Sequence, residues 1–311
     1  MLADRVKDIT TSGIRKIFDL ASQMKNPINF SIGQADFDVP LPIKEAAIEA
    51  IRNGHNRYTV TQGIPELRAK VMEDIQKRRG ISPEAAFITS GTSGGVLLAM
   101  TALLNPGDEV LLPDPYFMMY KNHTRLSGGV PKYYDLYPDF QLRPEEIEKQ
   151  ITEKTKIIML NSPSNPTGAV FSREAIEKVA QIAKKYDILV MTDEIYDAFV
   201  YDVPYYSVAS CYPKTIIFGG FSKTYGMPGW RMGFAAGPYE IIDKMITLQQ
   251  FSYICSPTPL QYGTLKAFDV DMTPYIEQYK IKRDLIYKGL LEMGCKVTKP
   301  EGSFYRDRKS T

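Results

Sequence analysis

The stretch KIIMLNSPSNPTGAVFSREAIEKVAQIAKKYDILVMTD, residues 156–193, contains two apolar runs with a helical pattern between them. The first run, 156–161, and the second, 188–192, consist almost entirely of apolar residues, which is typical of strands buried on both faces. Between them, Ser172 is a suitable N-cap for a helix whose apolar residues recur at helical spacing. A strand, a helix and a second strand in this order predict two parallel strands joined by a helical crossover.

The same alternation continues through the middle of the chain and predicts an α/β fold, with a largely parallel sheet covered by helices on both faces. A helix is expected to begin at Pro65 and to end at Gly80. Because ligands of such sheets bind at the carboxyl ends of the strands, the residues that follow each strand are the candidates for a site. The further strand-like runs are AFITS (86–90), DEVLLP (108–113), TIIFGG (215–220) and RMGFAAG (231–237).

The two flanks of this region have a different pattern. An amphipathic helix is expected over residues 12–24, followed by a loop over 31–42. After about residue 265, a long helix over 275–294 leads to a short predicted strand, CKVTK, at 295–299. A length of 311 residues is enough for two domains.

The composition excludes several classes of function. Lys and Arg number 38 against 36 Asp and Glu, a net charge of +2, so no basic surface for nucleic acid is expected. The longest apolar stretch, residues 94–104, is shorter than the roughly 20 residues that span a bilayer. The N-terminus lacks the apolar segment of a signal peptide. We therefore expect a soluble, cytoplasmic protein without membrane or nucleic-acid partners.

Histidine and cysteine are too scarce for several kinds of catalytic site. His55 and His123 are the only histidines, and Cys211, Cys255 and Cys295 stand tens of residues apart. This spacing fits neither a zinc site nor a Ser-His-Asp triad, and no disulfide framework is expected. Proton chemistry would then depend on Lys, Tyr, Asp or a cofactor.

The run FITSGTSGG, residues 87–95, places a Gly/Ser/Thr turn between a predicted strand and a predicted helix. Backbone N–H groups, the helix dipole and the hydroxyls of Ser90, Thr92 and Ser93 suit an anionic phosphate. An ordinary strand–helix turn has the same composition, and this motif alone favours that simpler interpretation.

Two further motifs follow the strands of the opening stretch. The Asn-Pro turn of NSPSNPTG, 161–168, either changes the chain direction or holds the Asn165 amide toward a ligand, with equal support for both. Asp193 ends an apolar run, where a carboxylate is unfavourable unless it faces a cation or a metal. The alternative for Asp193 is a helix N-cap, a role that Asp performs well.

The segment FGGFSKTYGMPGWRMG, residues 218–233, contains Lys223 directly after a predicted strand and Arg231 eight residues later. Most lysines are solvated surface groups. A lysine among apolar groups at a strand end can instead have a lowered pKa and form a Schiff base with a carbonyl.

In this order, the motifs resemble those of the class I/II aminotransferases, pyridoxal-phosphate (PLP) enzymes with the aspartate aminotransferase type of fold. The resemblance extends over about residues 14–305. It implies a mostly parallel seven-stranded sheet flanked by helices in a large PLP-binding domain, 44–265. A small α+β domain, expected to be incomplete, would come from 1–43 and 266–311. The matching motifs are IGQADFDVP (32–40), RYTVTQGIPELR (57–68), DPYFMMY (114–120), NPTG (165–168), DEIY (193–196) and SKTYGMPGWRMG (222–233).

The resemblance implies catalytic roles for three of the motif residues. Lys223 would bind the PLP aldehyde as an aldimine and move the proton between the substrate Cα and the cofactor. The reaction would be a ping-pong transfer of an amino group from an L-amino acid to a 2-oxo acid, a step of amino-acid biosynthesis. Asp193 would pair with the protonated pyridine nitrogen, and Tyr196, together with Asn165, would hydrogen-bond the phenolic oxygen of the ring.

Other residues are implied to hold the cofactor and the substrate. Phe117 would stack on the ring, unless it only packs in the core. Gly33 and Asn165 would contact the substrate, Gly33 at its carboxylate. Tyr58 would reach the phosphate of the neighbouring subunit, which implies a homodimer with shared sites. The remaining cofactor-binding residues are Gly91, Thr92, Ser93, Ser222 and Arg231, the arginine and the 91–93 turn serving the phosphate.

The chain departs from the family pattern at two places. Gly220 stands where many relatives have a phosphate-binding serine. The chain also ends six residues after Tyr305, whereas relatives continue and supply an arginine for the substrate carboxylate. Two alternatives to transamination therefore stay open. One is another PLP reaction, such as C–S β-elimination, and the other is a truncated, non-catalytic PLP-binding protein.

Overall fold

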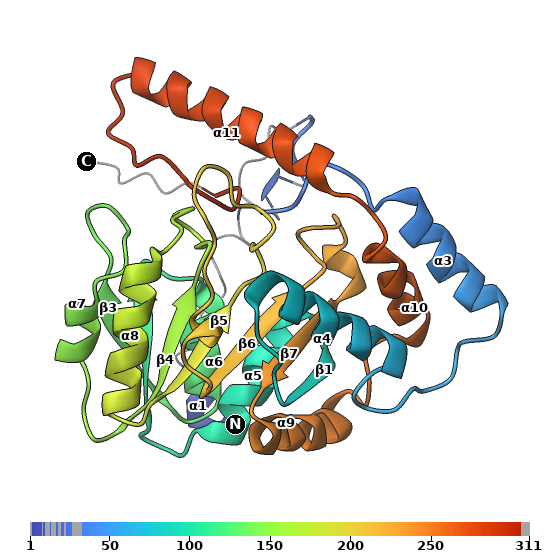
Figure 1. The fold of residues 1–311 in the computed structure, drawn as a ribbon, viewed down its shortest axis with the longest axis horizontal. Helices are drawn as coiled ribbons and strands as arrows, with labels where there is room; N and C mark the ends of the chain where they lie inside the picture. The colour runs from blue at the N-terminus through green and yellow to red at the C-terminus, as the bar shows by residue number, and fades with distance from the viewer. Residues whose placement is uncertain are drawn as a thin grey trace.

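A single sheet of seven strands lies at the centre of the molecule, with helices on both of its faces (Figure 1). The strands are β1 (Ala85–Ser90), β2 (Glu109–Asp114), β3 (Val130–Asp135), β4 (Thr155–Asn161), β5 (Leu189–Asp193), β6 (Thr215–Gly220) and β7 (Met232–Gly237). Their order in the sheet is β1-β7-β6-β5-β4-β2-β3. Strand β7 is antiparallel to both of its neighbours, and the other pairs are parallel. The predicted fold class is confirmed.

The computed structural model describes residues 33–305, together with residues 2–7, 9, 13, 17, 20–21 and 23–26. Two 3-10 helices, η1 (Val208–Ser210) and η2 (Pro228–Trp230), occur in the loops beside β6. The α-helices in the described part are α1 (Asp4–Lys7), α3 (Leu41–Arg52), α4 (Pro65–Arg79), α5 (Gly91–Leu103), α6 (Met118–Leu126), α7 (Pro144–Lys149), α8 (Arg173–Lys185), α9 (Tyr239–Ser252), α10 (Thr258–Ala267) and α11 (Thr273–Glu292).

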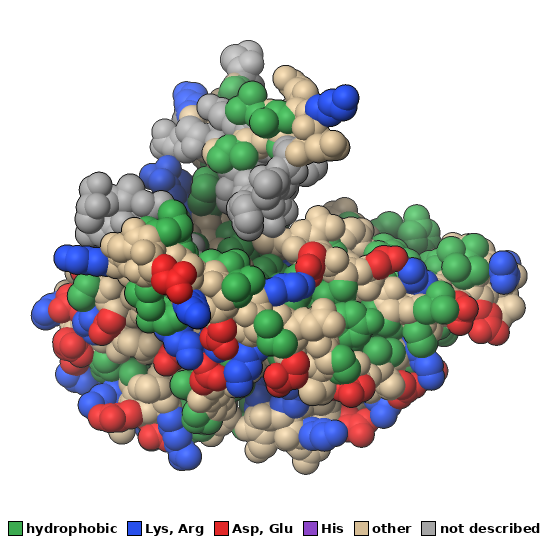
Figure 2. Space-filling view, turned by 90° about the horizontal axis from the view of Figure 1, so that it is seen from above, with side chains coloured by type: hydrophobic (Ala, Val, Ile, Leu, Met, Phe, Trp, Pro, Cys, Tyr) green, Lys and Arg blue, Asp and Glu red, His purple; other side chains and the backbone are tan. Residues whose placement is uncertain are grey.

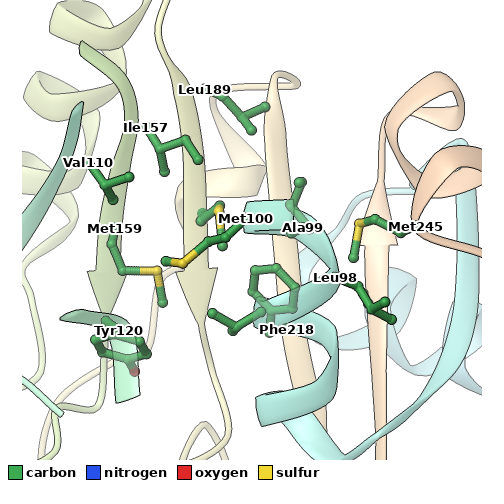
Figure 3. Close-up of a cluster of buried hydrophobic side chains, with 14 of the residues drawn as sticks. Leu98, Ala99, Met100, Val110, Tyr120, Ile157, Met159, Leu189, Phe218 and Met245 are labelled. Atoms are coloured by element: carbon green, nitrogen blue, oxygen red, sulfur yellow. The ribbon is translucent and has the colours of Figure 1, made fainter. Parts of the chain in front are cut away.

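Helices α5 and α9 cover one face of the sheet. Figure 3 shows Leu98, Ala99 and Met100 of α5 beside Met159 of β4 and Phe218 of β6. Met100, Met159 and Phe218 are fully buried, and burial of each such side chain contributes roughly 1.5–3 kcal/mol. This layer therefore holds the central strands in a fixed position.

The opposite face is covered by two groups of helices. Helices α7 and α8 pack on β2 to β5, and α3, α4 and α10 pack on β1, β6 and β7. In β5, Leu189 and Met191 face the α5 layer, whereas Val190 faces α8. Successive residues of a strand point to opposite faces, which explains why residues 188–191 are all apolar.

The carboxyl ends of β2, β4, β5 and β6 lie at one edge of the sheet, because these strands are parallel neighbours. Asn161, the last residue of β4, is paired with Asp193, the last residue of β5. Strand β1 ends at the same edge, since β1 and β6 both run antiparallel to β7. Helix α5 begins there immediately after Ser90. The motifs that follow the strands in the sequence are thus brought together in space.

The predicted helix boundaries agree with the structure where capping signals are strong. Ser172 precedes α8 and its hydroxyl accepts a hydrogen bond from the Ala175 N–H at 3.2 Å. Helix α4 begins at Pro65, and Gly80 follows it with φ +69°. A left-handed residue at this position ends a helix, and glycine adopts that conformation without strain.

Two expectations about the sheet are corrected. Strand β3 is not apparent in the sequence, because its Pro and Lys are typical of an edge strand, the position that β3 occupies. The predicted strand CKVTK is wrong, since residues 295–299 are irregular. A strand needs a neighbour to pair with, and no strand of the described residues lies beside this segment. The helix expected over 12–24 falls largely outside the described residues.

Acidic and basic side chains are interspersed over the face shown in Figure 2, without a patch of one sign. The net charge of +2 is therefore not gathered into a basic surface on this face. Within the part of the chain that the structure describes, no helix is both long enough and apolar enough to cross a membrane.

Candidate active site

A cavity of about 250 Å³ lies at the edge of the sheet where the strands end. It lies between the end of β5, the segment after β6, the start of α5 and the two ends of the continuous stretch 33–305. Its lining residues are Gly33, Thr92, Ser93, Phe117, Tyr120, Asn165, Asp193, Ile195, Tyr196, Ser222, Lys223, Pro228, Arg231 and Tyr305.

The Asp193 carboxylate is the most deeply buried charge in this cavity, with 2% of the residue exposed. Burial raises its pKa to about 6, while a hydrogen bond from Tyr120 lowers it. The Tyr120 hydroxyl donates to Oδ2 at 2.8 Å, and the Ile195 N–H donates to Oδ1 at 3.2 Å. The Asn161 side-chain amide fixes the end of β5, because it donates to the Asp193 backbone carbonyl at 2.9 Å. A carboxylate so placed favours a cationic group in the cavity.

Lys223 supplies an amine to the same cavity from the segment that follows β6. Burial lowers its pKa from the ordinary 10.5 to about 8, the Asp193 carboxylate acts in the opposite direction, and Arg231 lowers it further. The Nζ atom donates a hydrogen bond to the Gly33 carbonyl at 2.6 Å. At neutral pH about a tenth of this lysine is therefore an uncharged amine, the form that attacks a carbonyl.

Three polar side chains meet beside Lys223. The Tyr196 hydroxyl donates to the Tyr305 hydroxyl at 3.0 Å, and the Asn165 side chain is a second hydrogen-bonding neighbour of Tyr196. Burial raises the pKa of Tyr196 well above its usual value. Gly33 lies against Tyr305 so closely that an added Cβ would meet the Tyr305 hydroxyl. These contacts place hydrogen-bond donors at one wall of the cavity and keep Tyr196 protonated.

An anion cup lies at the mouth of the cavity, formed by the N-terminal turn of α5, Ser222 and Arg231. Arg231 Nη1 donates to the Pro228 carbonyl at 2.9 Å, and Nη2 donates to the Ser90 carbonyl at 3.3 Å. Gly91 has φ +66°, and a Cβ there would lie 2.5 Å from Arg231 Nη2. Only glycine thus allows the arginine to approach the helix N-terminus. Cationic guanidinium and helix N–H groups together favour an anion such as phosphate.

Gly220, which replaces the serine of many relatives, has a packing reason in this chain. A Cβ at this position would lie 3.0 Å from Ile195 Cδ1 and 3.2 Å from Gly233 Cα. A serine would therefore require Ile195 to move, and Ile195 is part of the cavity wall.

Ten of the twelve predicted site residues line the cavity, and two do not. Gly91 lies behind Thr92 and Ser93 and shapes the cup rather than lining it. Tyr58 is 78% exposed and lines separate surface hollows with Arg57. Phe117 is half-buried and lines the cavity while also packing on the α5 core cluster, so both of its predicted environments are present.

Four lining residues were missed by the sequence-based prediction, namely Tyr120, Ile195, Pro228 and Tyr305. Tyr120 lies in helix α6, three residues after Phe117, so that one helical turn brings both residues to the cavity. This spacing within DPYFMMY was the available signal. Tyr305 lies far from the other motifs in sequence, and only the folded chain reveals its contact with Tyr196.

A larger hollow, of about 680 Å³, lies at the opposite edge of the sheet. It is lined by residues at the starts of β4 and β5 and by Lys214, whose ammonium is paired with Asp187 at 2.7 Å. Its size is greater, but it lacks a buried carboxylate facing an amine, so we place the chemistry in the smaller cavity. Among the described residues there is no group of three or more His, Cys, Asp or Glu side chains that could hold a metal ion.

The chain is similar to known proteins over almost its whole length. The pattern of the aminotransferase class I and II family matches residues 25–306. An aspartate aminotransferase of Pyrococcus abyssi and an aromatic-amino-acid aminotransferase of Thermococcus litoralis are each 39% identical, covering 98% of this chain and 82% of each relative. The solved structure of Thermus thermophilus aspartate aminotransferase with maleate has a TM-score of 0.92 at 33% identity, covering 97% of this chain and 83% of that one.

The cofactor of this family, PLP, fits the side chains that line the cavity. The anion cup suits a phosphate, the buried Asp193 carboxylate suits a protonated ring nitrogen, and the partly neutral Lys223 amine suits an aldehyde. No part of this donor set conflicts with such a group. The chain therefore belongs to the aminotransferase class I and II family and is a PLP-dependent aminotransferase that acts on amino acids and 2-oxo acids.

Proposed function

We propose that this chain transfers an amino group by a ping-pong reaction in which Lys223 binds the cofactor and then moves the proton at the substrate Cα. The main support is that one cavity contains a half-buried amine and a buried carboxylate whose pKa values are both displaced toward neutrality, Lys223 to about 8 and Asp193 to about 6. Groups with such pKa values can gain and lose protons near neutral pH, as acid–base catalysis requires.

Lys223 is suited to hold and move a proton because its surroundings are largely apolar. PLP supplies an aldehyde that condenses with amines and a ring that withdraws electrons from the bound amino acid. The Lys223 amine would take the proton from Cα as the neutral base and return it as the ammonium. The Gly33 carbonyl, which accepts a hydrogen bond from Nζ at 2.6 Å, would orient the amine in the cavity.

Asp193 and Tyr196 would hold the ring through two different atoms. Asp193 would keep the ring nitrogen protonated, with Tyr120 holding the carboxylate in the ionised form. Tyr196 and Asn165 would donate hydrogen bonds to the phenolic oxygen, and Phe117 would lie on the ring face. The remaining cofactor contacts that we propose are Gly91, Thr92, Ser93, Ser222 and Arg231, at the phosphate.

The residue assignment is tested by reduction and peptide mapping. Purified protein with PLP is treated with borohydride, which fixes the cofactor to the amine that binds it, and the labelled peptide is identified by mass spectrometry. We expect the label on Lys223 and none in Lys223→Ala. A label on a different lysine would contradict the assignment. Visible spectra recorded on addition of aspartate or tyrosine, the substrate classes in the relatives' names, would identify the amino acid used.

We also propose a homodimer in which Tyr58 serves the site of the neighbouring subunit. Tyr58 does not reach the cavity of its own chain, and Val60 and Phe251 are 56% and 82% exposed. Exposed apolar side chains of this kind are typical of contact surfaces. Sedimentation should show a dimer. Tyr58→Phe should weaken PLP binding while the protein stays dimeric. A monomer with full PLP affinity would contradict shared sites.

The division of the chain and its compartment complete the proposal. We propose a PLP-binding unit over residues 44–265 and a second unit from 1–43 and 266–311. The position of α11, which crosses the top of the molecule away from the helix layers, supports this division (Figure 1). Limited proteolysis between α10 and α11 would test it.

The three unpaired cysteines suit the reducing cytoplasm, and cell fractionation would test that location.

A further inference from the structure

The turn that carries Asp193 and Tyr196, residues 193–197, has a second face that points away from the cavity. On that face lie Glu194 and Asp197, both held by the guanidinium of Arg79. Arg79 is the last residue of α4, and it is separated from the turn by more than a hundred residues of sequence. The Arg79 side chain is 1% exposed and the Glu194 side chain 0%.

The contacts of Arg79 are short and come from two nitrogens. Nε donates to Glu194 Oε2 at 2.6 Å, and Nη2 donates to Asp197 Oδ2 at 2.6 Å. The other Glu194 oxygen accepts from the Ser207 hydroxyl at 2.5 Å and from the Thr192 hydroxyl at 3.2 Å. Charge-assisted bonds in a fork geometry fix direction as well as distance. One buried side chain therefore holds both ends of the 193–197 turn.

The turn has further anchors on this side, among them Arg78, whose Nη1 lies 3.2 Å from Asp197 Oδ2 while the Arg78 side chain is 35% exposed. The Glu194 N–H donates to the Phe218 carbonyl at 2.8 Å, and Asn161 holds the Asp193 carbonyl from β4. The half of the turn that contains Tyr196 is held by the Phe199 N–H, which donates to the Tyr196 carbonyl at 2.8 Å, and by the contact of the next residue, Asp197, with the buried Arg79. We propose that Arg79 is a positioning residue, which sets the orientation of Asp193 and Tyr196 toward the cofactor through Glu194 and Asp197.

The proposal rests on the proposed roles of Asp193 and Tyr196, and electrostatics adds to the geometry. The groups that face Asp193 are Tyr120 from α6, the Ile195 N–H, Glu194 and Lys223. Of these, the Glu194 charge raises the pKa of Asp193. The adjacent Arg79 cation compensates the Glu194 charge, and thereby favours the ionised Asp193 that a protonated ring nitrogen requires.

Two substitutions separate positioning from stability. Arg79→Lys keeps the positive charge and removes the fork, so that one ammonium has to serve two carboxylates. Asp197→Asn is isosteric, keeps an oxygen that accepts a hydrogen bond, and lies at a site that is 11% exposed against 1% for Arg79, so we expect it to disturb the fold less than Arg79→Lys. The matched control is Lys70→Gln, which removes a solvent-exposed ion pair of the same helix, Lys70 to Glu73 at 2.9 Å.

Four measurements are made on each variant: thermal stability, PLP affinity from quenching of the single tryptophan, visible circular dichroism per bound PLP, and steady-state kinetics. Visible dichroism reports how firmly the protein orients the bound ring, independently of turnover. For both variants we expect reduced dichroism and a kcat lower by about tenfold or more, with KM changed less than about threefold, because misplaced groups slow the reaction more than they weaken binding. Lys70→Gln should match the parent protein.

The outcomes distinguish this proposal from the proposed function. Normal dichroism and normal kcat in both variants, with only a lower melting temperature, would overturn it and leave Arg79 a purely structural residue. If Arg79→Lys does not fold, the same two readouts of Asp197→Asn decide. If borohydride labels a lysine other than Lys223, the proposed function fails, while the dichroism still shows whether Arg79 orients the ring.

Discussion

Two sets of charged side chains lie on opposite faces of the 193–197 turn. They differ in whether each charge has a close partner of opposite sign. On the cavity face, Asp193 and Lys223 are not joined by an ion pair, and burial displaces the pKa of each toward neutrality. On the outer face, Arg79 is paired with Glu194 and Asp197 at 2.6 Å. The pKa of Arg79 is raised, so it stays charged, because the attraction of the two carboxylates exceeds the effect of burial.

The difference shows how one short turn combines reactivity with rigidity. A buried charge without a close counter-charge is unfavourable. This cost lowers the pKa of the Lys223 amine toward the range that proton transfer needs. A buried charge with close partners is held in place, and removing one partner is strongly destabilising. The charges of Asp193 and Lys223 can lack close partners because the ion pairs of the outer face fix the backbone of the turn. Substitutions on the two faces should therefore have opposite effects on activity and on stability.

The largest expected effect on the reactive face is that of Lys223→Met. Activity should be lost, because no other amine lines the cavity among the described residues, whereas stability should be retained or increased. The physical reason is that the substitution removes a poorly paired buried amine and keeps an apolar stem. Turnover assays and chemical denaturation without cofactor measure the two effects. A stability loss comparable to that of an outer-face variant would contradict the comparison.

On the outer face, the largest effect is expected from Glu194→Gln. This change leaves Arg79 with one charged partner in a buried site, and breaking such a pair costs about 3–5 kcal/mol of unfolding free energy. Urea denaturation of the cofactor-free protein measures the loss. The control is Glu174→Gln, which removes an exposed helical pair with Lys178 at 2.8 Å and should cost less than about 0.5 kcal/mol. Equal losses in the two variants would show that the Arg79 network is not a special anchor.

Much of the cavity face could be predicted from sequence, because its residues follow strands. Asn165, Asp193 and Lys223 come at or shortly after the ends of apolar runs, and the carboxyl ends of parallel strands meet at one edge. The roles themselves came from the family resemblance, since spacing alone left Asp193 open between a cation partner and a helix cap.

The outer face could not be predicted in the same way. Arg79 ends a helix in a run of three basic residues, KRR at 77–79, where the ordinary interpretation is a solvated C-terminal turn whose charges interact favourably with the helix dipole. Its burial depends on Glu194 and Asp197, which are more than a hundred residues away. Tyr120 is similar, because its partner Asp193 lies 73 residues further on. Partners at such separations are defined by tertiary packing, which no local pattern encodes.

A smaller effect is expected from Tyr120→Phe. This change removes the hydroxyl that donates a hydrogen bond to Asp193, and so leaves the reactive face with one partner fewer. The Tyr120 hydroxyl lowers the pKa of Asp193, so without it that pKa rises above about 6. A hydrogen bond to a charged group contributes about 1.5–3 kcal/mol, so the acidic limb of the pH–rate profile should move upward by about 1–2 on the pH scale. Stability should change little, as the ring stays buried. An unchanged acidic limb would show that Tyr120 does not act on Asp193.

The smallest expected effect is a pH dependence that distinguishes Lys223 from the paired lysines of the surface. Burial lowers the pKa of Lys223 to about 8, whereas its ion pair with Glu73 raises the pKa of Lys70 above 10.5. An ammonium does not attack an aldehyde, so the rate of adduct formation follows the neutral amine. For Lys223 that fraction rises from about 10% at pH 7 to about 90% at pH 9. The rate constant for PLP attachment to cofactor-free protein should therefore increase about ninefold over this range and then level off, as measured by stopped-flow absorbance.

Lys223→Ala should show only the slow reaction of surface lysines, whose rate keeps rising beyond pH 9. A rate that fails to level off in the parent protein would mean that Lys223 is as solvated as Lys70, and the contrast between the two faces of the turn would then be lost.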